Sequence, residues 1–209
     1  MGRVAGLLLL LAVSASAQEG VYYVSPTNGA DTNNGTEAEP FLTIEHALSQ
    51  TEPPPTTLRL EAGLYQPTGL PLTPASSVAF QGLGSTPDEV VIDGQDRGQI
   101  FRLTSAGATF SFENLSFVNG NSTSDRTFVG MNCTTEEACP QLRGGAIHAD
   151  GVSLQLDQVH FLDNNGLEGG AVYLKSANAR MDDCLFKNNT VDENWRRPDF
   201  LCQEGIPPP

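Results

Sequence analysis

Five charged residues in the second half of the chain are of types that could carry acid–base chemistry: Asp157, Asp182, Asp183, Lys175 and Lys187. Carboxylates and lysines can take up and release protons, and grouped carboxylate oxygens can bind Ca²⁺. Asp157 and Asp182 are 25 residues apart. Whether they form a site or only occupy equivalent turns depends on how the chain repeats between them.

The histidines offer a second candidate site. His46, His148 and His160 are not spaced as metal ligands. His148 aligns with Tyr173 at the same separation as the two aspartates. Such a pair, stacked on a surface, could hold a sugar, because aromatic faces pack against carbohydrate C–H groups. Two half-buried strand residues are the alternative interpretation. His160 precedes Phe161 and is expected to face outward.

A polar loop near the N-terminus contains Asn28, Asp31, Asn33 and Asn34. Its oxygens could bind a regulatory Ca²⁺, but their order does not match a known Ca²⁺ motif. Turn chemistry explains the same residues. We therefore expect no cofactor.

A period of 25 residues organises the second half of the chain. Gly-Gly-Ala-Ile at 144–147 recurs as Gly-Gly-Ala-Val at 169–172, and Phe161 recurs as Phe186. Phe117 provides a third copy when it is aligned with these two phenylalanines. Apolar or small residues then lie nine, seven, five and two positions before each phenylalanine: Ala108, Phe110, Phe112 and Leu115; Val152, Leu154, Leu156 and Val159; Ala177, Ala179, Met181 and Cys184.

The spacing of these apolar positions predicts strands that turn corners. A period of two places side chains on one face of a strand, and the step of three shifts the phase while keeping that face inward. Recurring once in every period, this pattern gives stacked coils. Asparagine tolerates left-handed backbone at corners, and its amides can stack between coils. The expected corner residues are Glu113-Asn114, Asp157-Gln158 and Asp182-Asp183, then Asn119, Asp163-Asn164 and Asn188-Asn189.

This repeat favours a parallel β-helix over two alternatives. Leucine-rich repeats have a similar period but need a Leu-x-x-Leu-x-Leu pattern with an Asn, which is absent. Paired helices are opposed by the Gly-Gly and Asn-Asn pairs and by the Val, Phe and Thr content. Further short strands are expected at 57–60, 77–80, 90–92, 100–103 and 109–112.

The sequence also resembles a known family. Gly-Gly-Ala-Ile/Val, followed within the same repeat by Phe-x-x-Asn at 161–164 and 186–189, is similar to the repeat of polymorphic outer membrane proteins. That repeat belongs to the pectate-lyase-like superfamily. Residues 22–48 resemble the opening segment of many secreted members. The resemblance implies an all-β fold, a single-stranded right-handed parallel β-helix solenoid with a short N-terminal capping helix.

The expected organisation has four parts. Residues 1–17 read as a signal peptide, because Arg3, the apolar run at 4–13 and Ala15-Ser16-Ala17 follow the order of such peptides. An N-terminal strand, loop and cap helix follow at 18–52, and coils follow at 53–193. A C-terminal tail occupies 194–209. It either caps the last coil or marks a truncated chain, and an uncapped coil would permit end-to-end association.

An insertion interrupts the coils. The interval from Phe117 to Phe161 is much longer than the interval from Phe161 to Phe186, and we assign the extra residues to a loop at 121–143. The loop contains Cys133 and Cys139, the preferred disulfide pair, although other pairings with Cys184 and Cys202 are open. Cys184 could instead be a small buried hydrophobe. Asn-x-Ser/Thr triplets that could accept glycans lie at Asn34, Asn114, Asn121, Asn132 and Asn188.

The charge of the chain limits its partners. It carries 11 Lys+Arg against 25 Asp+Glu, a formal charge of −14. A phosphate backbone has to be met by clustered Lys and Arg, so nucleic acid is not an expected partner. No stretch after the signal peptide is apolar enough for a membrane anchor. We therefore expect a secreted, extracellular or cell-surface protein without membrane insertion.

These observations favour a secreted, non-catalytic protein that binds a polysaccharide or a surface glycan, or serves in adhesion at a cell surface. The alternative is a pectate-lyase-like enzyme that degrades polysaccharide, or a fragment of one. Against that alternative, the sequence contains none of the recognisable catalytic sequence motifs of the superfamily. If Asp157 and Asp182 occupy the same corner of successive coils, a solvated turn explains them without catalysis.

Overall fold

The computed structural model describes residues 20–50, 56–123, 143–191 and, for the backbone alone, 200–203. Within these ranges the chain forms strands, one short α-helix and one 3₁₀ turn. No helix in the described part of the chain is long and apolar enough to cross a membrane. The elements are β1 (Val21–Val24), α1 (Ile44–Ser49), β2 (Thr56–Leu60), β3 (Gly63–Tyr65), β4 (Val78–Gly82), η1 (Pro87–Glu89), β5 (Val90–Asp93), β6 (Phe101–Leu103), β7 (Thr109–Val118), β8 (Ile147–Asp150), β9 (Ser153–Leu162), β10 (Asn165–Gly166), β11 (Val172–Lys175), β12 (Asn178–Asp182), β13 (Leu185–Lys187), β14 (Thr190–Val191) and β15 (Phe200–Gln203).

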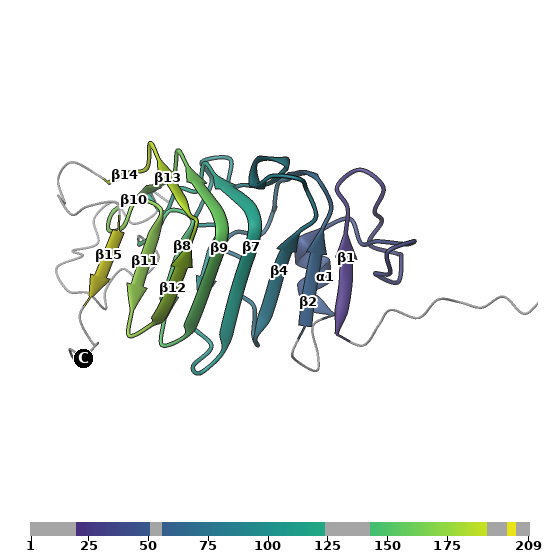
Figure 1. Cartoon of the computed structure of the whole chain (residues 1–209), viewed down its shortest axis with the longest axis horizontal. Coiled ribbons are helices and arrows are strands. Elements are labelled where there is room, and N and C mark those ends of the chain that lie inside the picture. Colours follow the sequence, from purple (N-terminus) through teal and green to yellow (C-terminus); the bar gives the residue numbers. More distant parts are fainter. Residues whose placement is uncertain (1–19, 51–55, 124–142, 192–199, 204–209) are drawn as a thin grey trace, which may run out of the picture.

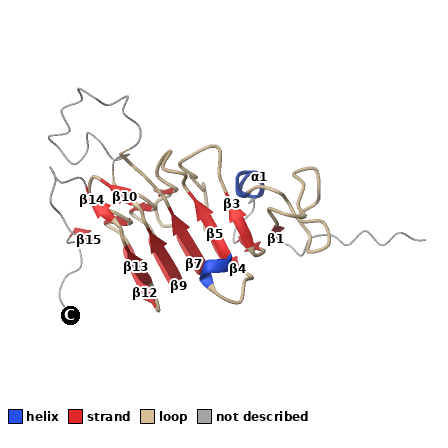
Figure 2. Ribbon diagram, turned by 90° about the horizontal axis from the view of Figure 1, so that it is seen from above, coloured by secondary structure: helices blue, strands red, loops and turns tan. Residues whose placement is uncertain are grey.

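Among the described residues every strand pairing is parallel, and the strands form three sheets. The largest sheet runs through β1, β2, β4, β7, β9 and β12, with β3, β5 and β13 joined to it. A second sheet contains β6, β8, β11 and β15, and a third contains β10 and β14. Consecutive strands such as β9, β10 and β11 lie in three different sheets, and each pairs with its equivalent one coil away. The fold is therefore an all-β solenoid whose coils follow one another along the long axis (Figures 1 and 2).

The register confirms the period read from the sequence. Phe161 pairs with Phe186, and Ile147 pairs with Val172. Phe117 pairs with Phe161 across the longer interval, as the alignment of the third copy requires. Side chains at equivalent positions therefore lie on top of one another in successive coils.

The corners also form where they were expected. Non-glycine residues adopt positive φ angles of 50° to 57° at both corners of the three aligned coils. A left-handed residue lets the strand change direction while its neighbours keep the same face inward. These corner residues are Asn114, Gln158 and Asp183 at the first corner and Asn119, Asp163 and Asn188 at the second.

Stacked phenylalanines fill the interior. The rings of Phe117 and Phe161 lie 5.3 Å apart, and those of Phe161 and Phe186 lie 4.8 Å apart with an angle of 11° between their planes. The first two phenylalanines are fully buried, whereas Phe186 is only partly buried. The apolar residues that recur before each phenylalanine follow the same trend. They are buried in and next to β7 and β9 and half-buried in and next to β12 and β13.

The repeated glycine pairs have separate roles. Gly144 and Gly169 adopt positive φ angles of 65° and 62°. The φ angle of Gly145 is not positive, but a Cβ atom at this position would lie 2.5 Å from the carbonyl oxygen of Gly170 in the next coil. The first glycine of each pair therefore makes a turn that disfavours side chains, and the second allows two coils to approach closely.

Bridges on both sides of the insertion define its ends. Asn121 pairs with Asn165, and Arg143 pairs with Glu168. One coil thus uses the whole stretch from Asn121 to Arg143 where its neighbour uses only the short stretch from Asn165 to Glu168, which agrees with the insertion. Asn121 and Arg143 themselves belong to the coils. Residues 124–142, with Cys133, Cys139 and Asn132, lie outside the described residues.

The two ends of the solenoid differ in how well they match the sequence prediction. The first strand and the short helix were expected in 18–52, and β1 and α1 are found there. The coils were expected to end at residue 193, but β15 lies within the expected tail and pairs with β11. The interval from Val172 to its partner Phe200 is longer than the interval from Ile147 to Val172, so the period read from the sequence does not reveal this strand.

Candidate functional site

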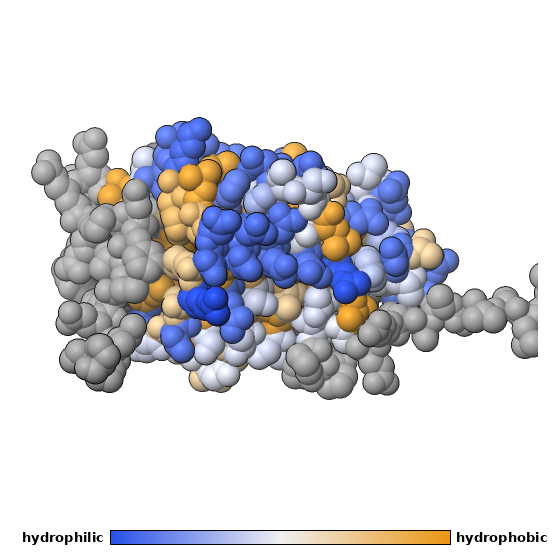
Figure 3. Space-filling view, in the orientation of Figure 1, coloured by the Kyte–Doolittle hydropathy of each residue, from blue (hydrophilic) through white to orange (hydrophobic). Residues whose placement is uncertain are grey.

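The outward face of β7, β9 and β12 carries two rows of polar side chains at the spacing of the strands. Ser111, Gln155 and Arg180 form one row, because each pairs with the next across the sheet. Glu113, Asp157 and Asp182 form the other in the same way. Together with Phe112 and Leu156 below them, these six residues line a shallow groove of about 260 Å³. We call it the sheet groove. The surface over β7 and β9 is mostly hydrophilic, with hydrophobic colour gathering near β13, which carries the exposed Leu185 (Figure 3).

The sheet groove is negatively charged. It holds three carboxylates and one guanidinium, and Arg180 Nη2 lies 3.2 Å from Asp182 Oδ2. The two side chains of this ion pair are 79% and 64% exposed. Neighbouring strands in a sheet are about 4.8 Å apart, so the carboxylates of adjacent coils stand close together. A ligand of the groove meets hydrogen-bond acceptors in one row and the donors of Gln155 and Arg180 in the other.

Only part of the candidate acid–base set comes together. Asp157 and Asp182 are register partners on the groove. Asp183 lies at the following corner, and Lys187 lies beyond that corner in β13. Lys175 belongs to the second sheet, where its Nζ lies 3.8 Å from Asp150 Oδ2. Arg180 is the cation that the structure brings to Asp182, and it was not among the residues expected from the sequence.

His148 and Tyr173 are neighbours, but they do not form a surface stack. Their ring centroids are 5.3 Å apart and their planes meet at 81°. Both residues are buried, with 2% and 1% of their surface exposed. The guanidinium of Arg143 lies 5.0 Å from the centre of the Tyr173 ring. The expectation of an open aromatic platform for a sugar was therefore wrong, because the flat faces of these rings are not available at the surface.

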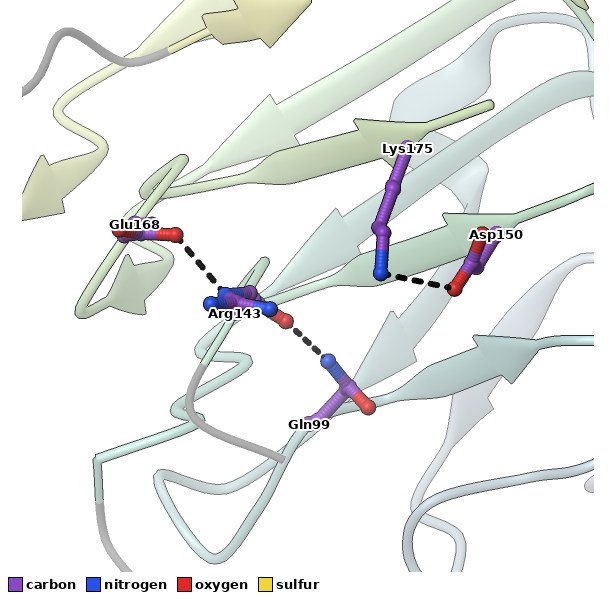
Figure 4. Close-up of polar contacts among 5 residues, drawn as sticks. All are labelled: Gln99, Arg143, Asp150, Glu168 and Lys175. Atoms are coloured by element: carbon purple, nitrogen blue, oxygen red, sulfur yellow. Dashed lines mark hydrogen bonds and ion pairs between the residues drawn. The ribbon is translucent and has the colours of Figure 1, made fainter. Parts of the chain in front are cut away.

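A buried polar network surrounds the start of β8. Arg143 Nε donates to Glu168 Oε2 at 2.8 Å, and Gln99 Nε2 donates to the carbonyl of Arg143 (Figure 4). Gln99 Nε2 also donates to the carbonyl of Gly144 at 2.9 Å. Arg102 Nε in turn donates to Gln99 Oε1 at 3.1 Å. Burial lowers the pKa of the Arg102 guanidinium. The network holds the chain where it re-enters the coils after the insertion, which is a structural role.

A second polar cluster gathers around η1. His160 Nδ1 lies 2.7 Å from Asp88 Oδ1. Ser116 Oγ donates to the carbonyl of Pro87 at 2.9 Å and lies 3.3 Å from the same Asp88 oxygen. Ser116 is fully buried and gives its proton to a backbone carbonyl, so it is placed as an anchor for η1 rather than as a nucleophile. His160 faces outward, as expected, and its side chain is 22% exposed.

The polar loop near the N-terminus uses its side chains within the protein. Asp31 accepts bonds from the amides of Leu42 and Thr43 at 2.9 Å and from Thr43 Oγ1 at 2.8 Å. Partial burial raises the pKa of Asp31, but these bonds and the charge of His46 outweigh it and hold the pKa below 3.8. Asn33 Nδ2 donates to the carbonyl of Pro40, and the amide of Asn28 donates to Ser25 Oγ. Among the described residues, no group of three or more His, Cys, Asp and Glu side chains is arranged to hold a metal ion.

Cys184 is the one cysteine whose side chain the structure describes. It is a free thiol, half-buried against the core of β12 and β13, and burial raises the pKa of the thiol. The side chain of Cys202 lies outside the described residues, although its backbone pairs with Leu174. The free thiol contradicts the pairings that include Cys184, whereas the pairing of Cys133 with Cys139 stays a prediction.

Comparisons with known proteins support the fold. The chain is similar to the crystal structure of the GH136 lacto-N-biosidase from Eubacterium ramulus in its native form, with a TM-score of 0.52 and 15% sequence identity. The match covers 80% of this chain and 34% of that one, so this chain spans about a third of the enzyme. The selenomethionine derivative of the same enzyme matches with a TM-score of 0.48 and 16% identity, over 80% and 34% of the two chains. No protein-family model matches the chain. A search of the curated proteins also finds no match.

Proposed function

We propose that this chain is a secreted, right-handed, single-stranded parallel β-helix that binds a glycan in the sheet groove. The observation that carries the proposal is the pair of polar rows, Ser111–Gln155–Arg180 and Glu113–Asp157–Asp182, which repeat at the spacing of the coils. A polymer with regularly repeated hydroxyl groups suits such a surface, because the same hydrogen-bonding partners recur along it.

The handedness and the ligand class each have separate support. Connections between parallel strands of one sheet are right-handed in about 98% of cases, and this fold consists of such connections. The structural neighbour is named as a lacto-N-biosidase, which agrees with a carbohydrate as the ligand. The lining agrees as well, since carboxylates accept bonds from hydroxyl groups, and amide and guanidinium groups donate to ring and hydroxyl oxygens.

The charge of the groove selects among glycans. Three carboxylates face one guanidinium, and that guanidinium is already paired with Asp182. A polyuronate would bring further negative charge to this surface, and like charges at close range repel. We therefore favour a neutral or amino-bearing glycan over pectin or polygalacturonate as the ligand.

A second candidate function is hydrolysis of the bound glycan. The observation that favours it is that Asp157 and Asp182 lie side by side on one surface. Glycoside hydrolases place an acid and a base or nucleophile on the two sides of the scissile bond. Both carboxylates are exposed and Asp182 is paired with Arg180, so binding without cleavage is the preferred function.

The test is a calorimetric titration of the full chain with three hexasaccharides of equal length: a neutral glucan, a glucosamine hexamer and hexagalacturonate. We expect binding of one of the first two and at least tenfold weaker binding of the third. Gln155→Ala with Asp157→Asn should weaken binding at least tenfold, and Glu37→Gln, an exposed residue outside the groove, should leave it unchanged.

Three outcomes would separate the alternatives. No binding of any hexasaccharide, or binding that the groove variant does not change, would overturn the proposed site. Equal binding of hexagalacturonate would overturn the selection by charge. Reducing ends that appear with the natural chain and are lost in Asp157→Asn would favour hydrolysis instead.

A further inference from the structure

Three of the described Asn-x-Ser/Thr triplets, at Asn34, Asn114 and Asn188, differ in what their asparagine side chains do. Transfer of an N-linked glycan requires the asparagine Nδ2 to give up one of its two protons. A bond forms between Nδ2 and C1 of the sugar, and the bond between C1 and the diphosphate of a lipid-linked oligosaccharide breaks. A folded protein can carry the product only where Nδ2 faces open solvent and needs no more than one hydrogen bond.

Asn114 uses both protons inside the fold. Its Nδ2 donates to the carbonyl of Gly82 at 3.1 Å and to that of Gly84 at 2.7 Å. Gly82 lies so close that a Cβ atom there would be 2.0 Å from the carbonyl oxygen of Asn114. A sugar on Nδ2 would remove one of these bonds and would have to occupy the contact between two coils.

Asn188 occupies a corner with the same backbone conformation, but its side chain is free to carry a glycan. Its φ angle is 57°, against 52° for Asn114. It is exposed, and its Nδ2 donates to none of the described residues. The difference between the two triplets thus lies in their surroundings and not in their local backbone.

Asn34 is exposed as well, and it has a further feature. Its Oδ1 accepts bonds from the amide of Thr36 at 3.2 Å and from Thr36 Oγ1 at 2.8 Å. The hydroxyl that defines the triplet therefore contacts the asparagine side chain, and Nδ2 donates to none of the described residues.

We propose that the folded protein carries N-linked glycans on Asn34 and Asn188 and none on Asn114. The inference is independent of the ligand of the sheet groove. It places the glycans at the polar loop near the N-terminus and at the second corner of the last aligned coil, both outside the groove.

Site mapping tests the proposal. The full chain is secreted from insect cells behind a standard cleavable leader, so that entry to the secretory pathway does not depend on residues 1–17. The folded monomer is isolated, its glycans are released enzymatically in ¹⁸O water, and labelled sites are read by peptide mass spectrometry. We expect label at Asn34 and Asn188 and unmodified Asn114.

Variants keep the result interpretable. Thr190→Ala and Thr36→Ala should each remove the mass of one glycan from the secreted protein, and Ser116→Ala, which abolishes the triplet at Asn114, should leave its glycan mass unchanged. Because Ser116 anchors η1, the natural chain alone also decides the question. Label at Asn114, or its absence from either Asn34 or Asn188, would overturn the proposal.

Discussion

Asn164 and Asn189 lie one coil apart, and the Nδ2 group of Asn164 donates to Oδ1 of Asn189 at 3.0 Å. Asn164 also donates to the carbonyl of Phe117, and its Oδ1 accepts the amide of Gly120 at 2.8 Å. Asn189 Nδ2 makes the equivalent bond one coil further on, to the carbonyl of Phe161. The two amides thus form a buried ladder that joins three coils at the second corner.

Removing one step of this ladder should destabilise the protein. Asn164→Ala leaves the amide of Gly120 and the carbonyl of Phe117 buried without that partner. We expect a loss of about 2 to 6 kcal/mol, because each unsatisfied buried group costs roughly 1 to 3 kcal/mol. Urea unfolding measures the change. Asn178→Ala, at an exposed strand position, is the matched control and should change the free energy by less than about 0.5 kcal/mol. Equal effects would contradict a structural role for the ladder.

Two phenylalanines of the same stack should differ in importance. Phe161 is fully buried, whereas Phe186 is partly buried. Phe161→Ala should cost about 3 to 5 kcal/mol, the usual range for a buried aromatic side chain. Phe186→Ala should cost less than half as much, since part of its ring already contacts solvent. Thermal unfolding of both variants checks the order, and a reversed order would mean that Phe186 is more enclosed than described.

The close approach of coils at Gly120 should not tolerate a side chain. A Cβ atom at this position would lie 2.4 Å from the carbonyl oxygen of Gly145 and 2.8 Å from Asn164 Oδ1. We expect Gly120→Ala to destabilise the protein by about 1 to 3 kcal/mol, as overpacking does. Gly69→Ala meets nothing within 4 Å and should be neutral in the same melting experiment. A neutral Gly120→Ala would show that the coils can move apart there without cost.

The stability contributed by Asp31 should depend on pH. Its pKa is held below 3.8 in the folded protein, so its contribution is fully present above that value and is lost as the pH falls through the lower, folded pKa. The difference in unfolding free energy between the natural chain and Asp31→Asn should therefore shrink on acidification below about pH 4. Thr43→Val removes the bond from Thr43 Oγ1 and should reduce the pH-dependent part. A difference that stays constant from pH 6 to pH 2.5 would contradict this role.

The sequence predicted the coils well because the coils are made by repetition. Apolar spacing, corner asparagines and glycine pairs recur at fixed distances, and parallel stacking converts those distances into contacts. Arg180 was missed because its row contains Ser111, Gln155 and Arg180, three different residue types that carry no repeat signal.

Other contacts could not be predicted because they cross between irregular segments. Asp88 reaches His160 over 72 residues, and Gln99 reaches Gly144 over 45. Their loops have lengths that no period constrains. The burial of His148 and Tyr173 was missed for a related reason, since alternation along a strand tells which face a side chain occupies and not what covers that face.

The arrangement of the coils also governs how the protein comes apart. Among the described residues, β12 and β13 each pair only with β9. In contrast, β9 pairs with β12 and β13 on one side and with β7 on the other. Nearest-neighbour assemblies of this kind lose order progressively from a weakly held end. Backbone amides should therefore exchange with deuterium fastest near Met181, more slowly near Leu156 and slowest near Phe112, so that the molecule carries a built-in gradient of rigidity along its axis.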